Sequence, residues 1–225
     1  MPKNLAFETV ALLLLGTISG AAQPAGAMPE EPVPRAAPRP PVLEAFARAW
    51  AGVTAYSATL TFFEQKGTNV QDTVLEYGFR KPSSVTVRII AGRNAGVTLK
   101  WDGGATVEAT RGRGLFAALF KKDIALHDPL MTSIRGSSID ELSYGAILAH
   151  AEETEGALSE APGDTIDGTS TESLSLVPRT PAADTGFSRE SIEISTATQL
   201  PIRIRAYEGT QLVRKIDFSN VNPER

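Results

Sequence analysis

The sequence predicts an α+β fold, in which a strongly curved antiparallel sheet of about eight strands or more has its hollow covered by helices. Three observations predict it. Apolar and polar residues alternate in many successive segments, as in antiparallel strands that bury one face. Residues typical of turns separate these segments. Two other segments carry their apolar residues at helical spacing.

Length and composition fit one globular domain. The chain has 225 residues, of which 42% are hydrophobic, so it can bury one sizeable core. Its net charge of −4 argues against a nucleic-acid-binding protein, because phosphate contacts require a basic excess. It has no cysteine, which excludes disulfides, thiol nucleophiles and thiolate metal sites.

The N-terminus has the features of a secretory signal peptide. An apolar run at Val10–Ile18 precedes Ala25-Gly26-Ala27, which has the small-x-small form that signal peptidase accepts. We expect cleavage near Ala27, which removes residues 1–27. The alternative is an uncleaved anchor, but Glu8 leaves the run shorter than the ~20 apolar residues that span a bilayer. Six prolines in residues 28–41 predict an extended spacer before a single domain at 42–225.

An amphipathic helix is expected to begin the domain at Val42. Phe46, Trp50 and Val53 fall at helical spacing, and Gly52 is the expected C-cap. The apolar stripe of this helix must cover part of the sheet. We therefore expect Trp50 to be buried where the helix meets the strands.

A first meander follows this helix directly. Its first strand runs from Tyr56 to Lys66 and turns at Gly67, and Asp102-Gly103 suits a tight hairpin later in the meander. The other strands expected in this half are 74–80, 85–90, 97–101 and 105–109.

The middle of the chain carries less regular patterns. The apolar segment Leu115–Phe120 indicates a short helix or turn, either as core or as part of a lid or membrane-touching patch. A second helix is predicted from Ser138 to His150, with Glu141 at capping-box spacing. The acidic stretch Glu152–Ser173 is expected to be mostly an exposed loop. A second meander follows, with strands at 174–176, 192–194, 202–206 and 212–218.

The sequence contains no pattern typical of an enzyme. Its two histidines, His127 and His150, are too few for a three-histidine zinc site and lack the HExxH spacing. It has no nucleophile elbow and no phosphate-binding loop. We therefore expect no catalytic residue, no metal and no cofactor, and a structural or solvated role for both histidines.

Charge is distributed unevenly along the chain. Residues 74–122 carry nine basic and three acidic side chains, whereas residues 136–178 carry nine acidic and no basic ones. Both can be ordinary solvated surfaces. Alternatively, the basic surface meets anionic lipid head groups or an acidic partner, an attraction that salt screens over about 10 Å.

Several short segments stand in an order typical of a known superfamily. They are Val53–Ala58, Phe63–Lys66, Arg80–Pro82, Trp101–Gly103, Leu174–Arg179, Leu200–Ile204 and Phe218–Val221. Through them the chain, from about Val42 to Asn222, resembles the outer-membrane lipoprotein carrier superfamily, the LolA/LolB-like fold. The resemblance implies an unclosed β-barrel whose hollow is covered by helices. It also implies a periplasmic protein that holds an acyl chain or another hydrophobic ligand between sheet and helices, without cofactor or catalysis.

One position departs from this superfamily. The carrier has an arginine directly before the corner proline, where this chain has Lys81, and alternation points Arg80 to the opposite face. Lysine lacks the planar five-donor fork of arginine, which puts arginine-based lid gating in question here. Lys81 is therefore a candidate gate or head-group contact.

Three classes of function remain open. The preferred one is a carrier for a hydrophobic ligand, meaning a lipid or an acylated protein; the alternative is a non-catalytic sensor or scaffold that binds another envelope protein. A secreted hydrolase is disfavoured by the missing motifs. We expect a monomer that binds no nucleic acid. The residues expected to line the hollow are Tyr77, Phe79, Val87, Leu99 and Trp101 on the sheet and Leu142 and Ile147 on the covering helix, although each could instead be core.

Overall fold

A computed structural model describes residues 39–112 and 121–225, and the structural statements below concern these residues. The expected signal peptide at 1–27, most of the spacer at 28–41 and the apolar segment Leu115–Phe120 lie outside them. None of the helices in the described part of the chain is long and apolar enough to cross a membrane.

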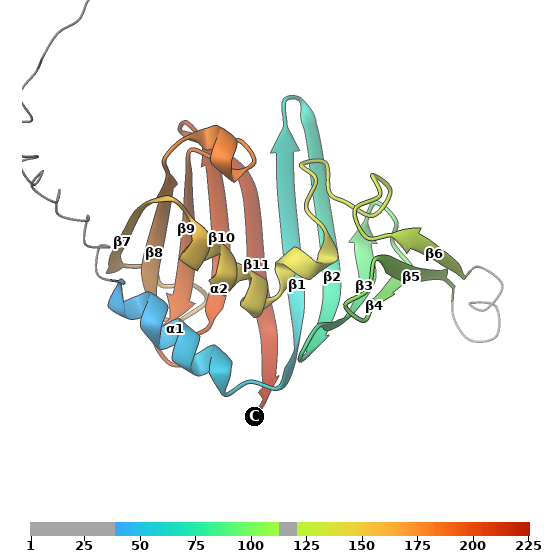
Figure 1. Cartoon of the computed structure of the whole chain (residues 1–225), viewed down its shortest axis with the longest axis horizontal. Coiled ribbons are helices and arrows are strands. Elements are labelled where there is room, and N and C mark those ends of the chain that lie inside the picture. Colours follow the sequence, from blue (N-terminus) through green and yellow to red (C-terminus); the bar gives the residue numbers. More distant parts are fainter. Residues whose placement is uncertain (1–38, 113–120) are drawn as a thin grey trace, which may run out of the picture. The chain divides into compact units, whose positions relative to one another are not determined.

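One antiparallel sheet of eleven strands forms the domain. The strand order is β6-β5-β4-β3-β2-β1-β11-β10-β9-β8-β7, so each half is a meander of sequence neighbours, and the first and last strands pair in the middle (Figure 1). β6 and β7 remain at the two edges, which makes the barrel unclosed, as expected. The strands are β1 (Ala55–Lys66), β2 (Asn69–Arg80), β3 (Ser84–Gly92), β4 (Val97–Trp101), β5 (Thr106–Arg111), β6 (Lys122–Ala125), β7 (Gly156–Pro162), β8 (Thr171–Pro178), β9 (Arg189–Ser195), β10 (Pro201–Glu208) and β11 (Gln211–Glu224).

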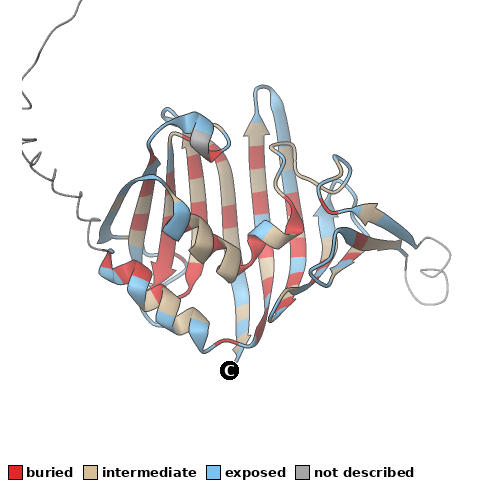
Figure 2. Ribbon diagram, in the orientation of Figure 1, coloured by how far each residue is buried: buried red, intermediate tan, exposed pale blue. Residues whose placement is uncertain are grey.

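Helices lie across one face of this sheet. α1 (Pro41–Ala51) and α2 (Tyr144–Glu153) both cross it, and the short 3-10 turn η2 (Ile139–Leu142) leads into α2 (Figure 1). A second 3-10 turn, η3 (Pro181–Asp184), connects β8 to β9. Buried positions alternate with more exposed ones along the strands beneath the helices (Figure 2). The alternation that predicted the strands therefore marks the covered face of the sheet.

Two charged side chains, one from β7 and one from the turn between β2 and β3, hold α1 at both ends. The backbone N–H of Val42 donates to Glu160 Oε2 at 3.0 Å. At the other end, Lys81 Nζ donates to the carbonyls of Trp50 at 2.8 Å and Ala51 at 3.3 Å. A carboxylate near the N-terminus of a helix and an ammonium near its C-terminus both complement the helix dipole. These two contacts fix where α1 lies across the sheet.

The second helix begins later than the sequence predicts. Ser143 has extended backbone and its side chain accepts the N–H of Ala146 at 3.1 Å, so α2 starts only at Tyr144. Ser138 stands directly before η2 but its side chain does not cap this turn, because its hydroxyl donates to the carboxylate of Asp140 instead. The prediction of one continuous helix from Ser138 was therefore wrong.

The acidic stretch after α2 is also more ordered than predicted. Residues 156–162 form β7 and residues 171–178 form β8, so the prediction of a long loop over Glu152–Ser173 was wrong. β7 is an edge strand whose side chains are nearly all exposed. A strand that buries neither face carries no apolar alternation, so the sequence gives no sign of it. The short edge strand β6 was missed for the same reason.

Tyr144 is the centre of an aromatic cluster that joins α2 to α1 and to the sheet. Its ring stacks on Tyr56 with a centroid distance of 4.4 Å and contacts the rings of Phe218 at 5.3 Å and Trp50 at 6.2 Å. Trp50 is partly rather than fully buried there. The Tyr144 side chain is fully buried, and its hydroxyl has no hydrogen-bond partner within the described residues.

Two substitutions can separate the contribution of the Tyr144 ring to stability from that of its hydroxyl. Tyr144→Phe is expected to leave the free energy of unfolding unchanged or to raise it by up to about 1 kcal/mol, because it removes an unsatisfied buried hydroxyl. Tyr144→Ala is expected to lower it by about 3–5 kcal/mol, because it empties the cluster. Urea unfolding followed by circular dichroism measures both. A clear loss of stability in Tyr144→Phe would contradict the orphaned hydroxyl.

Candidate functional site

A cavity of about 380 Å³ lies between the covered face of strands β1 to β6 and the residues before α2. We call residues 129–142 the covering segment. Most of the cavity wall is apolar, and Leu130 at its edge is 64% exposed, so the cavity opens to solvent there. The apolar lining residues are Phe62, Leu75, Val87, Ile89, Val97, Leu99, Ala109 and Ile124 from the strands and Pro129, Leu130, Met131, Ile134, Ile139 and Leu142 from the covering segment.

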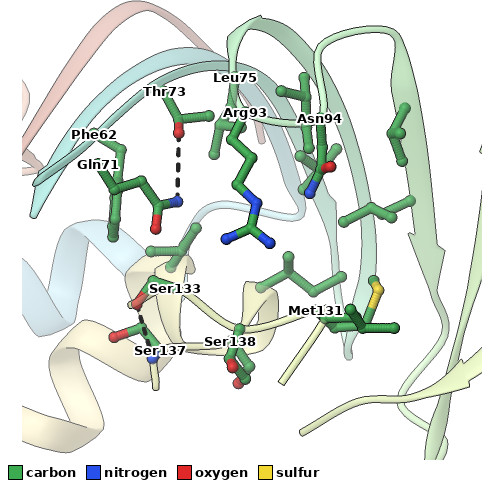
Figure 3. A pocket seen from close by; sticks show the side chains of 18 of the residues that line it. Phe62, Gln71, Thr73, Leu75, Arg93, Asn94, Met131, Ser133, Ser137 and Ser138 are labelled. Carbon is green, nitrogen blue, oxygen red and sulfur yellow. Dashed lines mark hydrogen bonds between the residues drawn. The ribbon is translucent and has the colours of Figure 1, made fainter. Parts of the chain in front are cut away.

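Polar side chains also reach this cavity. Arg93, in the turn between β3 and β4, extends its guanidinium into the cavity (Figure 3). Gln71 and Thr73 approach from β2, where Gln71 Nε2 donates to Thr73 Oγ1 at 3.4 Å. Arg93 makes no hydrogen bond or ion pair with another residue in 39–112 or 121–225. An apolar chamber with an unpaired guanidinium suits an amphiphile that carries an anionic group.

Hydrogen bonds to β1 and β2 fasten the covering segment over the cavity. The N–H of Ile134 donates to Gln71 Oε1 at 3.1 Å. The next residue, Arg135, donates its N–H to Glu64 Oε2 at 3.2 Å and its Nη1 to the Gln65 carbonyl at 2.6 Å. The contacts that hold the covering segment in place are therefore polar, although the surface that the segment covers is mostly apolar.

Glu64 is the centre of this attachment. Its side chain is fully buried, and Arg214 of β11 donates Nε to its Oε1 at 2.8 Å. Arg135 and Arg214 also lie over the ring of buried Phe187, with guanidinium-to-centroid distances of 5.0 Å and 4.6 Å. Arg135 is paired with Glu208 as well. The carboxylate thus has two partners, which a buried charge requires.

A second cavity, of about 350 Å³, lies on the other side of the covering segment and is more strongly charged. His150, Asp184 and Glu190 share its wall, and His150 Nε2 lies 2.6 Å from Glu190 Oε2. The hydrogen bond to Glu190 raises the pKa of His150. Burial raises the pKa of Asp184 to about 6. These side chains come from α2, η3 and β9, so the sequence gives no sign that they meet.

Of the seven residues expected to line the hollow, the structure brings three to the first cavity. Val87 and Leu99 line it from the sheet, and Leu142 lines it from the covering segment. Leu142 also borders the second cavity, which Ile147 lines from α2. The predicted wall is therefore divided between two cavities on either side of Leu142.

The other predicted residues lie elsewhere. Phe79, Trp101 and Lys81 border a surface depression beside the end of α1. Tyr77 is buried, and its hydroxyl donates to the Ile139 carbonyl at 3.3 Å. Lys81 holds the last carbonyls of α1, and its ammonium lies 4.4 Å from the centroid of the Trp50 ring. A gating role for Lys81 stays a prediction.

Sequence reasoning predicted no ligand contact for Arg93, for Gln71 or for any residue of the covering segment other than Leu142. Arg93 lies in the Gly92–Gly96 turn, where alternation says nothing about which way a side chain points. Leu130 and Met131 form an isolated apolar pair, too short to show a period. The sequence signal that could have indicated a covering element here is this apolar pair, which directly follows Pro129 in a region with no predicted strand.

The sequence matches no protein-family model and no curated protein. Its fold is similar to solved structures. These include the lipoprotein LppX from Mycobacterium tuberculosis, with 12% identity and a TM-score of 0.43 over 80% of this chain and 93% of that one. A LolA superfamily protein from Nitrosomonas europaea has 10% identity and a TM-score of 0.37 over 82% of this chain and 92% of that one. The MucA/MucB complex of Pseudomonas aeruginosa has 12% identity and a TM-score of 0.40 over 82% of this chain and 56% of that one.

The attachment of the covering segment can be tested at Glu64. Glu64→Gln keeps the size of the side chain but leaves Arg214 buried without its carboxylate, so we expect a loss of about 3–5 kcal/mol in the free energy of unfolding. The control is Glu224→Gln, which breaks an ion pair with Arg80 in which both side chains are more than half exposed, and which should cost about 0–1 kcal/mol. Urea unfolding measures both. Equal midpoints for the two variants would contradict the attachment.

Proposed function

We propose that this protein is a non-catalytic carrier for an amphiphile with an acyl chain, which it holds between strands β1 to β6 and the covering segment. The observation that carries the proposal is the combination of an apolar chamber with the guanidinium of Arg93, which has no partner in the described residues. The acyl chain would lie along the apolar wall that includes Leu99. The anionic group would contact Arg93, whose guanidinium extends into the cavity (Figure 3).

The volume of the cavity is large enough for one acyl chain of moderate length. Ligand pockets are typically about 300–1,000 Å³, and this cavity of about 380 Å³ lies near the lower end. Each buried methylene contributes about 0.8 kcal/mol, which is about fourfold in affinity. A longer chain would extend past exposed Leu130 into solvent, where further methylenes contribute little.

The proposal predicts a dependence of affinity on chain length. In titrations of delipidated protein with the saturated acids from octanoate to palmitate, affinity should rise about fourfold per methylene and then level off once the cavity is full. Leu99→Asp should abolish binding, because it places a charge in the apolar wall. The control is Val70→Asp, at a position on β2 that is 54% exposed and outside the cavity, with fold monitored by circular dichroism.

The same titrations test the anionic group. Arg93→Gln should weaken binding of the acids by about 10- to 150-fold, because a hydrogen bond to a charged group is worth about 1.5–3 kcal/mol. Binding of the matching monoacylglycerols should be unchanged. Arg48→Gln, on the solvent side of α1, serves as the control. Absence of lipid in the native preparation, together with no binding of these ligands by the parent, would exclude the carrier function. The alternative would then be a scaffold that binds another envelope protein.

The proposal includes export to the periplasm. The apolar run at Val10–Ile18 and Ala25-Gly26-Ala27 support it. Expressed with its own leader in a Gram-negative host, the protein should appear in the periplasmic fraction and begin at Met28. N-terminal sequencing that finds Met1 in the membrane fraction would rule it out.

A further inference from the structure

Three potential metal ligands from separate elements converge at the second cavity. His150 comes from α2, Asp184 from η3 and Glu190 from β9, and one ligand atom from each lies within 4.8 Å of the other two. His150 Nε2 is 2.6 Å from Glu190 Oε2 and 3.8 Å from Asp184 Oδ1. Tertiary structure alone brings them together, because 34 and 40 residues separate the two carboxylates from the histidine (184 − 150 and 190 − 150).

The burial of this cluster distinguishes it from an ordinary acidic surface. The side chains of Asp184 and Glu190 are only 9% and 5% exposed. Asp184 Oδ2 is buried and has no hydrogen-bond partner within the described residues. A buried carboxylate oxygen without a partner is costly, so the native protein is expected to satisfy it. Residues 39–112 and 121–225 place no donor at this oxygen, whereas an ion bound by the cluster would satisfy it.

Neighbouring cations are already engaged elsewhere. Arg214 also lines the cavity, but its Nε donates to Glu64 and its Nη2 to Ser137. Arg135 donates to Gln65 and pairs with Glu208. In the part of the chain that the structure describes, the two buried carboxylates thus have one imidazole as their shared ion-pair partner, and a divalent cation would offset the remaining negative charge.

We propose that His150, Asp184 and Glu190 form a binding site for a divalent transition-metal ion, with Zn²⁺ as the fitting case. Imidazole and carboxylate oxygens are both zinc ligands, and three protein ligands leave a fourth position for water or a ligand group from the cavity. Tetrahedral bonds of about 2.0–2.2 Å place ligand atoms roughly 3.3 Å apart. The separations of 2.6 Å and 3.8 Å from His150 Nε2 lie on either side of that value, and the two carboxylates lie within 4.8 Å of each other. Binding would therefore require the carboxylates to move closer together around the ion.

This site differs from the sequence-based expectation that the protein holds no metal and that His150 is structural or solvated. It is also separate from the proposed acyl-chain cavity, since none of its three ligands lines that cavity. The His150 side chain is 41% exposed, which gives an ion access from the second cavity. A bound ion would join α2 to η3 and β9.

The composition of the chain makes the test direct. The sequence contains two histidines and no cysteine, so imidazole coordination in protein purified without a histidine tag has two possible sources. Isothermal titration of the parent with ZnCl₂ should show one saturable site, and the midpoint of thermal unfolding should rise when Zn²⁺ is present and fall back on addition of a chelator. His150→Ala should weaken Zn²⁺ binding by at least tenfold. The control is His127→Ala, which removes the other, exposed histidine and should leave affinity unchanged.

Two variants that preserve side-chain size keep the test decisive if His150→Ala does not fold. Asp184→Asn and Glu190→Gln should each weaken Zn²⁺ binding by at least tenfold while circular dichroism shows the parent fold. Leu99→Asp should bind Zn²⁺ as the parent does, which separates this site from the proposed carrier function. Absence of saturable Zn²⁺ binding by the parent, or unchanged affinity in His150→Ala and Asp184→Asn, would overturn the proposal.

Discussion

The structure depends on one constraint. A single curved sheet must bury its apolar face away from water, and in the described part of the chain only a few short elements outside the sheet are there to cover it. Sandwiches solve this problem by packing two sheets together, whereas here two short helices and the covering segment lie across eleven strands. Side chains of the sheet alone do not fill the space beneath them. The cavities on the two sides of Leu142 are the space that remains.

Polar contacts decide where the covering elements lie. Glu160 and Lys81 hold the two ends of α1, while Gln71 and Glu64 hold the covering segment. Apolar packing is not directional, so it alone would allow a short segment to take several positions on the apolar face of the sheet. Hydrogen bonds are directional, so they specify one position instead. The polar margins of the first cavity therefore set its width, while most of its wall is apolar.

The sequence predicts the fold well where one face of a strand is buried. Alternation located the strands of both meanders, and it failed at β6 and β7 because edge strands with exposed sides show no period. The candidate sites were less predictable. Val87 and Leu99 could be found from alternation, but the Glu64 and Arg214 pair spans 150 residues, and the cluster at His150 joins three elements. Such contacts depend on the tertiary arrangement, which local patterns do not encode.

The pairing of the first strand with the last has a consequence for folding kinetics. Ala55 pairs with Glu224, whereas every other strand pair joins neighbours in sequence. Hairpins within each half close short loops, but the central pair must close a loop of nearly the whole domain, which carries a larger entropic cost and slows folding. We expect the two meanders to form early as separate curved halves and the β1–β11 seam to join them last. In pulse-labelling hydrogen exchange, the amides of the seam would then gain protection together, after those of the hairpins on either side.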